Sequence, residues 1–547
     1  MAVLMDIGIP SLDFLQSPKF WVAFHTILWY SLTRISRLTT LHRYVRLLVH
    51  CYSHWTYKSI IPRAEKPKYT SQDVTVVLPT IHNRFEELQP SVASILACQP
   101  AKLILVTTWN KHAALEQMVA TLRPAASACF TDIEVLHVDK ANKRLQVCKA
   151  LEEDHVKTPI TVMADDDVEW PSTLMPWLLA PFDDDAIGGV GTCQRVKRVE
   201  GDLSTQVYNW LGAAYIERRN FEISATHNID GGTSCMSGRT GAYRTRILKS
   251  YDFLGGFKNE KWGKYILNAD DDNYVTRWLV AHQWKTWIQY HPECEIETTL
   301  ETSTKFLYQC SRWARSNWRS NWTSLVHERY VLTQQPWCTY ALHIATFTSL
   351  AFVVDPLLLF SCWWATEDWD PTDRLTLLVA EIIFMFAFTK VVKLVGLFRK
   401  NPSDLVFLPV SIIFGYFHGF IKLYALFTLK QTSWGSRADG DEHNTFRLQE
   451  KPRPSESLAI PSGPDLPDST RAYRLSQSRH MTMPAQKCES TKCEVAATPR
   501  PIDTLATPPG PDLPDSTRTS CPSQALRITM PTQKREGNIC SVTADLL

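Results

Sequence analysis

The chain is long enough for two or three domains, and its charges nearly balance. It has 547 residues, 44% of them hydrophobic, and a formal net charge of +2. This balance excludes a strongly basic or acidic protein, and we expect no nucleic-acid partner. Fourteen cysteines are scattered without C-x-x-C spacing, which argues against a disulfide framework and predicts reduced thiols in a cytosol-facing domain.

Three hydrophobic stretches predict membrane spans. The first covers about 12–35, and the basic run that follows it favours the cytosolic side. The stretches 337–362 and 374–397 each approach the roughly 20 residues that a bilayer requires. The acidic segment 366–373 between them suits the outer face. The sequence therefore predicts a multi-pass protein of the cell membrane whose soluble part faces the cytosol.

A fourth apolar stretch, 405–429, is interrupted by Pro409, Gly415, His418, Gly419 and Lys422. Polar backbone at such breaks is tolerated only where protein or a water-filled cavity covers it. We predict a broken, re-entrant or interfacial pair of segments that returns to the cytosolic side. The alternative is a third full span, which would place the rest of the chain outside.

The composition changes near residue 438 to Pro, Ser, Thr and charged residues, which predicts a disordered tail. The tail holds a direct repeat, since LAIPSGPDLPDSTR (458–471) recurs as LATPPGPDLPDSTR (505–518). The predicted organisation is therefore an N-terminal membrane segment and basic linker (1–64), a soluble domain (65–300), interfacial helices (301–336), membrane helices with a following loop (337–437) and the tail (438–547).

The soluble region alternates apolar runs with helical patterns. We predict strands over 74–78, 103–107, 133–138 and 160–163, with helices between them that include 85–96 and 143–153. Such alternation predicts an α/β domain with a largely parallel sheet. Ligands of such sheets bind beyond the carboxyl ends of the strands, where Thr80 and Asp165 stand.

Asp165, Asp166 and Asp167 follow the fourth predicted strand. Asp165 and Asp167 can both turn toward one ion, and carboxylate oxygens suit Mg²⁺ or Mn²⁺. Such an ion would neutralise a diphosphate leaving group. The alternative is a solvated acidic loop or a helix N-cap.

Three later motifs carry further candidates. A glycine-rich segment over 230–244 contains Cys235, and it reads as a loop at an acceptor site or as an ordinary turn. An aspartate of Asp270-Asp271-Asp272 could accept a proton from an attacking hydroxyl, although the cluster could equally cap a helix over 273–280. In the motif at 309–313, Arg312 could grip a diphosphate while Trp313 stacks on a sugar, or both could anchor an interfacial helix.

Together these motifs resemble those of processive family 2 glycosyltransferases, in particular hyaluronan synthases and fungal type 2 glycosyltransferases of cell-surface polysaccharide synthesis. CMSGRTGAYR (235–244) is similar to their C-[LI]-S-G-P-L-G-x-Y-R, and ADDDNYVTRW (269–278) to G-D-D-R-H-L-T-N-R. QCSRWARSNWR (309–319) resembles Q-Q-x-R-W-x-K-S-x-x-R, and the end of 422–437 resembles a W-G-T-R loop. Arg239 replaces the proline of the acceptor loop, so we expect a different acceptor preference.

The resemblance implies a nucleotide-diphospho-sugar transferase-like fold and a set of roles. Asp271 would be the general base, with Asp270 as the alternative, and Asp165 and Asp167 would hold Mg²⁺ or Mn²⁺. The other implied roles are nucleotide-sugar binding by Pro79, Thr80, Lys143, Asp165, Asp166, Asp167, Arg312, Trp434 and Arg437, and acceptor binding by Cys235, Ser237, Gly238, Gln309 and Trp313.

The implied function is that of an inverting membrane glycosyltransferase. It would use a UDP-sugar to polymerise, and export across the bilayer, an extracellular or cell-wall polysaccharide, as at a fungal surface during hyphal growth. The alternatives are a non-processive transferase acting on a lipid-linked acceptor and a non-enzymatic membrane transporter or scaffold. The motifs name neither the sugar nor the oligomeric state.

Overall fold

The computed structural model describes residues 44–432, apart from residues 83, 153 and 349. All of these residues belong to one compact unit of the chain, Met1–Arg453. The span predicted over 12–35, the loop with Trp434 and Arg437, and the tail from 438 lie outside the described residues.

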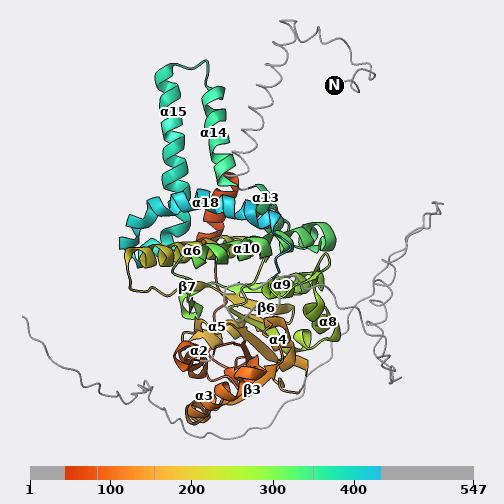
Figure 1. Cartoon of the computed structure of the whole chain (residues 1–547). Helices are drawn as coiled ribbons and strands as arrows, with labels where there is room; N and C mark the ends of the chain where they lie inside the picture. The colour runs from red at the N-terminus through yellow and green to blue at the C-terminus, as the bar shows by residue number, and fades with distance from the viewer. Residues whose placement is uncertain (1–43, 83, 153, 349, 433–547) are drawn as a thin grey trace, which may run out of the picture. The chain divides into compact units, whose positions relative to one another are not determined.

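The soluble part is built on a seven-stranded sheet with the order β11-β6-β8-β4-β1-β2-β3 (Figure 1). Neighbouring strands are parallel except around β8, which runs antiparallel to both β4 and β6. The largely parallel α/β sheet expected from the sequence is therefore confirmed. The strands are β1 (Val74–Pro79), β2 (Lys102–Thr108), β3 (Asp132–Val138), β4 (Ile160–Ala164), β6 (Ile187–Thr192), β8 (Thr240–Arg244) and β11 (Lys285–Gln289).

Helices cover both faces of the sheet, which is why its central strands are continuous apolar runs. Successive residues of β1 point to opposite faces, so Val76 packs in one core cluster and Val77 in the other. The first cluster includes residues of α2 (Phe85–Ala97), α3 (Trp109–Ala128) and α5 (Leu174–Leu179). The second includes residues of α4 (Lys143–Glu152), α7 (Thr245–Leu248), α8 (Tyr251–Asn259) and α9 (Asp271–Ala281).

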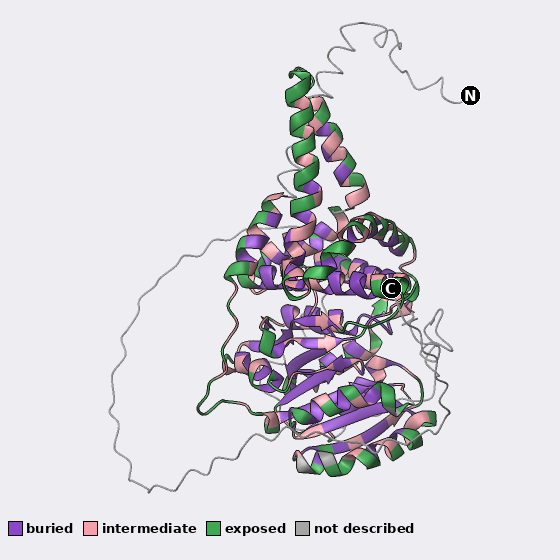
Figure 2. Cartoon of the chain, turned by 90° about the vertical axis from the view of Figure 1, so that its left-hand side faces the viewer, coloured by how far each residue is buried: buried purple, intermediate pink, exposed green. Residues whose placement is uncertain are grey.

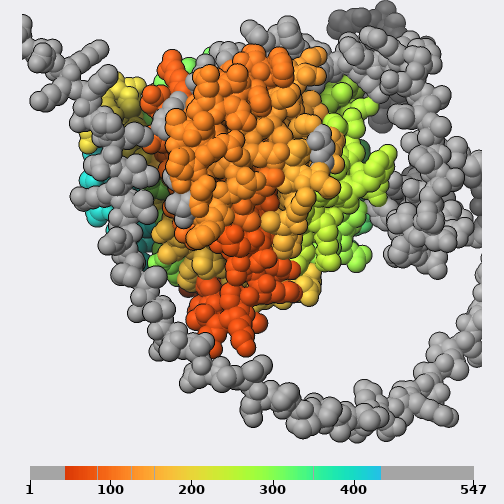
Figure 3. All heavy atoms as spheres, turned by 90° about the horizontal axis from the view of Figure 1, so that it is seen from below, coloured from red at the N-terminus to blue at the C-terminus, as the bar shows by residue number. Residues whose placement is uncertain are grey.

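Smaller elements complete this domain. A three-stranded sheet of β5 (Val168–Glu169), β12 (Ile296–Thr298) and β7 (Gln194–Val196) follows the carboxyl ends of β4 and β6, and β9 (Lys261–Trp262) pairs with β10 (Tyr265–Ile266). The face seen from below in Figure 3 is formed largely by the orange segment that includes α3.

A second layer of helices lies over the carboxyl edge of the sheet. Its long members are α6 (Leu203–Asp230), α10 (Lys305–Trp322) and α18 (Leu408–Phe427) (Figure 1). Asp202 caps the start of α6, and Gly231, with φ of +72°, ends it in the left-handed conformation that glycine adopts easily. Trp210, Phe306 and Phe414 join the three helices in one core cluster.

Within the described residues, two helical stretches are long and apolar enough to cross a membrane, Pro371–Lys400 and Pro402–Phe427. The first contains the span predicted over 374–397 and begins with α15 (Pro371–Ile383). Leu375, Val379 and Ile383 of α15 are between 44% and 60% exposed, as expected of a lipid-facing surface. Figure 2 shows the same contrast between the buried strands and the exposed flanks of α15 and α14 (Ala351–Ala365).

The span predicted over 337–362 is a bent pair of helical stretches in the structure. The structure has two helical stretches here, Pro336–Thr348 and Ala351–Ala365, which are bent by 88° relative to each other. Leu350 precedes α14 with φ of −80° and ψ of 96°, an extended conformation that a continuous helix cannot contain. The bent pair counts as a third candidate span only if its two parts are taken together.

The break predicted within 405–429 is also absent. Pro409 lies in the first turn of α18, where its missing N–H is not needed, and the helix then continues through Gly415 and Gly419 to Phe427. At Gly419 a Cβ atom would stand 2.5 Å from the ring of Phe352, so this glycine permits close packing against α14. Figure 1 shows α18 lying across the base of α14 and α15. One continuous helix therefore replaces the predicted broken pair.

Short helical segments connect these elements. They are α11 (Tyr330–Gln334), α12 (Pro336–Cys338), α13 (Ala345–Thr348), α16 (Thr389–Val391) and α17 (Val395–Lys400), with π-helical turns at Thr323–Glu328, Thr339–Ile344 and Phe384–Phe388.

A buried ion pair joins the sheet domain to the helical layer. Arg319 of α10 donates from Nε to Asp270 Oδ2 at 2.7 Å and from Nη2 to Asp270 Oδ1 at 3.0 Å. Its Nη1 donates to the carbonyl oxygens of Leu429 and Gln431. Asp270 and Arg319 are 6% and 2% exposed, so neither charge is stabilised by water if the other is removed. The pair thus fixes the start of α9 against α10.

We expect Arg319→Met to lower the free energy of unfolding by about 3–5 kcal/mol, because it leaves the Asp270 carboxylate buried without its partner. Asp270→Leu combined with Arg319→Met should recover much of this loss. Thermal unfolding in detergent would measure both effects, with Lys305→Met on the exposed side of α10 as the control. Additive losses in the double variant would contradict the coupling.

Candidate functional site

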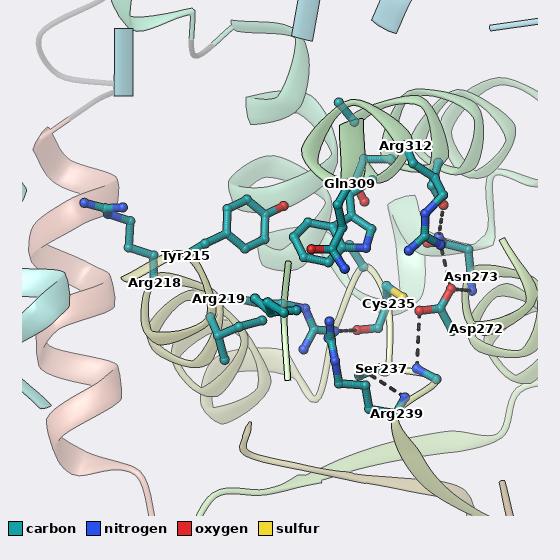
Figure 4. Close-up of a pocket in the computed structure, with 18 of the residues that line it drawn as sticks. Tyr215, Arg218, Arg219, Cys235, Ser237, Arg239, Asp272, Asn273, Gln309 and Arg312 are labelled. Carbon is teal, nitrogen blue, oxygen red and sulfur yellow. Dashed lines mark hydrogen bonds between the residues drawn. The ribbon is translucent and has the colours of Figure 1, made fainter. Parts of the chain in front are cut away.

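One cavity of about 680 Å³ lies between the carboxyl edge of the sheet and the helical layer. The end of β4, the glycine-rich segment before β8, the start of α9, and α6, α10 and α18 all contribute to its lining. Figure 4 shows part of this lining, with Asp272, Cys235 and Arg312 close together. The site predicted from strand ends and motifs is thus one continuous space.

Lys143, at the first position of α4, bridges two carboxylates in the cavity. Its Nζ is 2.7 Å from Asp165 Oδ1 and 2.8 Å from Asp271 Oδ2. Burial opposes the charged ammonium, but the two carboxylates prevail and raise the pKa of Lys143 well above its ordinary value. The structure therefore unites the end of β4 with the start of α9 through one permanent positive charge.

Asp166 turns away from the cavity that Asp165 and Asp167 line. Its Oδ2 accepts a hydrogen bond from Thr80 Oγ1 at 2.7 Å, and its backbone oxygen accepts one from Ser91. Thr80 follows Pro79, the last residue of β1, and donates its N–H to Val106 of β2. Neither Pro79 nor Thr80 lines the cavity, so these predicted residues form the layer behind Asp165.

The three carboxyl groups at the start of α9 have different surroundings. Asp270 is held by Arg319 and Asp271 by Lys143, and in both cases the cation outweighs burial and lowers the pKa. Asp272 has backbone donors instead: its Oδ1 accepts from Asn273 N–H at 2.8 Å and its Oδ2 from Gly238 N–H at 3.3 Å. Burial and the nearby charge of Asp271 raise the pKa of Asp272.

Asp272 is therefore the carboxyl group of this cluster with the greatest affinity for a proton. From the sequence, the helix was expected to begin at residue 273, and Asp272 was not singled out among the candidates for the general base. The helix begins at Asp271 instead, so Asp272 lies in its first turn and faces the glycine-rich segment. The sequence feature that could have indicated Asp272 is the position of the aspartate cluster 270–272 directly before an amphipathic helix.

The glycine-rich segment brings Cys235, Ser237 and Gly238 into the cavity, as predicted. A Cβ atom at Gly238 would lie 3.1 Å from Lys143 Nζ and 3.3 Å from Asp272 Cβ, so a side chain here would have to displace one of these residues, and glycine avoids that. Burial, together with the charge of Asp272, raises the pKa of the Cys235 thiol well above its usual range. Cys235 is therefore a protonated, unreactive thiol that lines the cavity.

Arg239, which departs from the family pattern, is directed into the cavity wall. It donates to Thr298 Oγ1 and to Gln194 Oε1, each at 3.1 Å. Its guanidinium carbon lies 5.6 Å from the ring centroid of Trp313. Arg239 thus supports Trp313 from one side.

Gln309, Arg312 and Trp313 of α10 all line the cavity, which matches their predicted placement. The ring of Trp313 stacks on that of Tyr215, with centroids 5.0 Å apart and planes inclined by 28°. Burial, then the charge of Arg239, lowers the pKa of Arg312 from its very high ordinary value. The sequence analysis did not predict Tyr215 as a site residue. The helical spacing of Tyr215, Arg218, Arg219 and Glu222, which places them on one face of α6, could have indicated it.

The carboxylates at the end of β4 fit a divalent ion that shares its ligands with a substrate. Among residues 44–432 as described, no three His, Cys, Asp or Glu side chains form a metal-binding group. Mg²⁺ and Mn²⁺ are commonly held by one or two carboxylates together with substrate phosphates. Asp165 and Asp167, which both face the cavity, satisfy this requirement.

Comparison with known proteins agrees with these features. Residues 71–316 match the family model described as glycosyltransferase like family 2. A type 2 glycosyltransferase of Gibberella zeae is 66% identical over 460 residues, which is 84% of each chain. A second, from Pyricularia oryzae, is 65% identical over 422 residues, covering 77% of this chain and 85% of the relative.

More distant proteins are also similar. A hyaluronan synthase of Streptococcus pyogenes is 21% identical over 387 residues, covering 68% of this chain and 85% of the relative. Among solved structures, the mannosyltransferase PcManGT of Pyrobaculum calidifontis, in complex with GDP-Man and Mn²⁺, is 15% identical. It covers 73% of this chain and 98% of its own, with a TM-score of 0.46.

The Gibberella zeae relative is two-thirds identical over most of both chains, and the family model spans the sheet domain and most of α10. The chain therefore belongs to the family 2 glycosyltransferases.

Proposed function

We propose that this glycosyltransferase is a membrane enzyme that moves a sugar from a UDP-sugar onto a growing polysaccharide, with inversion at the anomeric carbon. The observation that carries the proposal is the single cavity in which Asp165, Asp167, Asp272 and Trp313 meet. The donor's diphosphate would bind at Asp165 and Asp167, which follow β4, and the acceptor sugar would lie on the aromatic platform, that is, the stacked rings of Trp313 and Tyr215.

The donor side combines carboxylates and cations. Asp165 and Asp167 would hold Mg²⁺ or Mn²⁺, which offsets charge on the leaving UDP. Lys143 and Arg312 face the same space and would contact the diphosphate, with Arg312 offering a planar pair of donors. Thr80 and Asp166 would support the nucleoside side through their hydrogen bond. Trp434 and Arg437 would cover the bound donor, as the resemblance to the W-G-T-R loop implies.

The contacts move our assignment of the general base from Asp271 to Asp272. Asp271 is engaged by Lys143, which weakens it as a base, whereas Asp272 accepts hydrogen bonds from neutral donors, which are the backbone N–H groups of Gly238 and Asn273 and the Asn273 amide, and has a raised pKa. In the proposed step, an acceptor hydroxyl oxygen attacks the anomeric carbon while its proton passes to Asp272. The bond between that carbon and the diphosphate oxygen breaks, and UDP leaves with the electron pair.

Polymerisation is favoured over a single transfer by the extent of the cavity. Beyond Trp313 and Tyr215 it continues along α6 to Lys390 and α18, leaving room for an acceptor longer than one sugar. We propose a multi-pass cell-membrane location with the sheet domain in the cytosol, and export of a cell-surface or cell-wall polysaccharide. The second candidate is a single transfer onto a lipid-linked acceptor. Size analysis of radiolabelled product distinguishes a polymer from a single addition.

Asp272→Asn should lower kcat by about 10²- to 10⁴-fold and leave UDP binding unchanged, because only the proton acceptor is lost. Asp271→Asn should weaken UDP binding as well, since it releases Lys143 from its bridge. Transfer of radiolabelled sugar and calorimetric UDP binding would measure the two effects. Full activity of Asp272→Asn, together with a loss confined to kcat in Asp271→Asn, would return the base to Asp271.

The rate of transfer should fall as the pH decreases through the pKa of Asp272, because the protonated carboxyl group cannot accept a proton. Since this pKa is raised, the acidic limb of the pH–rate profile should lie above about 3.9, the value of an ordinary aspartate. Replacing Asp272 with Glu should retain an acidic limb, whereas the Asn variant should lose it. A wild-type profile with no acidic limb above the ordinary value would oppose the assignment.

Chelation should abolish transfer, and Mg²⁺ or Mn²⁺ should restore it, because without the cation the carboxylates of Asp165 and Asp167 would repel the diphosphate instead of helping to neutralise it. UDP should also bind more weakly after metal removal. Asp167→Asn should weaken the binding of Mn²⁺, followed by electron paramagnetic resonance, while Asp183→Asn, in the short 3-10 helix Ala180–Asp183 outside the cavity lining, should not. Unchanged turnover after exhaustive dialysis against chelator would reject the requirement.

A further inference from the structure

The turn before α9 has a backbone conformation that few residues adopt. Asp270 has φ of 67° and ψ of 25°, which is the left-handed region. A residue other than glycine persists there only where its surroundings hold it, and such residues cluster at functional sites. The next two residues are Asp271 and Asp272, whose side chains line the cavity. The contacts that hold this turn therefore also set the direction of those two carboxyl groups.

Arg144 of α4 supplies contacts of this kind. Its Nη2 and Nε donate to the carbonyl oxygen of Ala269, at 2.9 and 3.3 Å, and its Nη1 donates to that of Phe257 at 2.8 Å. Nη2 also donates to Glu260 Oε2 at 2.6 Å, so the charge of the guanidinium group is compensated. One planar group thus fastens the turn to the end of α8.

Two aromatic rings confine this guanidinium group. Its central carbon lies 5.1 Å from the ring centroid of Phe257 and 5.6 Å from that of Tyr274. Tyr274 belongs to α9, and its N–H donates to the carbonyl oxygen of Asp270 at 3.0 Å. Arg144 therefore contacts the turn and also the first part of the helix that follows it.

Arg144 is placed to act on the turn and not on a substrate. It is 1% exposed and lies outside the cavity lining, which its neighbour Lys143 joins. The residue on its other side, Asn142, also reaches the turn, because its Nδ2 donates to Asn268 Oδ1 at 2.7 Å. Three consecutive residues at the start of α4 thus hold the segment 268–271.

We propose that Arg144 is a positioning residue for the transfer reaction. By holding the turn 268–270, it directs the carboxyl group of Asp272 toward the acceptor hydroxyl, and it touches neither substrate. This inference rests on the proposed role of Asp272 as the proton acceptor. A reacting group displaced by about 1 Å can lower the rate by about 10²-fold. Loss of the contacts of Arg144 should therefore slow the chemical step and spare donor binding.

The test compares Arg144→Lys with the wild-type full chain in detergent. Lysine keeps the positive charge beside Glu260, but an ammonium group lacks the planar fork that reaches Ala269 and Phe257 together. Arg144→Lys should lower kcat by about tenfold to a hundredfold and leave the affinity for UDP within about twofold. Asn268→Ala, which removes the milder contact with Asn142, should lower kcat by a smaller factor and serves as the second variant.

Arg244→Lys is the matched control, because Arg244 has similar contacts at the opposite edge of the sheet. Arg244 is 4% exposed, donates to the carbonyl oxygens of Phe182, Asp184 and Ile187, and lies over the ring of Phe182. It pairs with Ile160, the first residue of β4, whereas the cavity lies beyond the last. The control should lose thermal stability to a similar extent and keep its kcat.

Hydrogen–deuterium exchange of residues 268–274 gives a readout that requires no turnover. These amide groups should exchange faster in Arg144→Lys than in the wild type and at the wild-type rate in Arg244→Lys. In a double-variant cycle, Arg144→Lys should cost little further activity once Asp272→Asn is present, because Arg144 acts through Asp272.

Unchanged kcat and exchange in folded Arg144→Lys, or equal losses of kcat in Arg144→Lys and Arg244→Lys, would overturn the positioning role. A selective loss of UDP affinity in Arg144→Lys would overturn it in favour of a donor contact. Full activity of Asp272→Asn would refute the proposed proton acceptor, and with it the direction given to Arg144. The exchange measurement separates these failures, because it reports on the turn whether or not sugar is transferred.

Discussion

Carboxylates gathered in a buried space repel one another unless cations stand between them, and this requirement organises the protein. Lys143 comes from the start of α4 and joins Asp165 to Asp271. Arg319 comes from α10 and neutralises Asp270. The sheet domain cannot hold its acidic edge alone, because one compensating charge belongs to the helical layer. The two layers therefore form one chemical unit, and a change in the packing of α10 would alter the charge balance where reaction is proposed.

The same arrangement gives the neighbouring aspartates different properties. Residues 270–272 have one chemical identity, yet their partners are Arg319, Lys143 and the backbone of Gly238 and Asn273. A carboxylate paired with a cation is a weak base, whereas one with neutral donors beside another negative charge retains proton affinity. These different surroundings underlie the proposed division into a structural, a bridging and a proton-accepting carboxyl group.

Charge also gives the cavity a direction. Acidic groups and their cations occupy the end near the sheet, Trp313 and Tyr215 form the middle, and Arg218 of α6 and Lys422 of α18 line the other end. A charged donor and a sugar ring would each meet suitable chemistry in that order. Residues of α18, the helix that lies across the base of α14 and α15 (Figure 1), line the far end. An unbroken α18 can carry Ser411, His418 and Lys422 on one face, which a broken pair could not guarantee.

The sequence by itself determined the parts that depend on local pattern. Continuous apolar runs predicted β1 to β4 to within a residue or two, and the strand end predicted Asp165, because a strand buried on both faces leaves a clear trace in composition. The motifs predicted that Cys235, Gln309, Arg312 and Trp313 would share a site, and they do. Tertiary structure alone decided which aspartate keeps its proton affinity, that Asp166 turns to Thr80, that Tyr215 completes the platform, that the chain turns at Leu350 and that α18 stays whole. The physical reason is that a pKa, a ring stack or a helix packed through glycine depends on partners far away in the chain, and local composition carries no record of them.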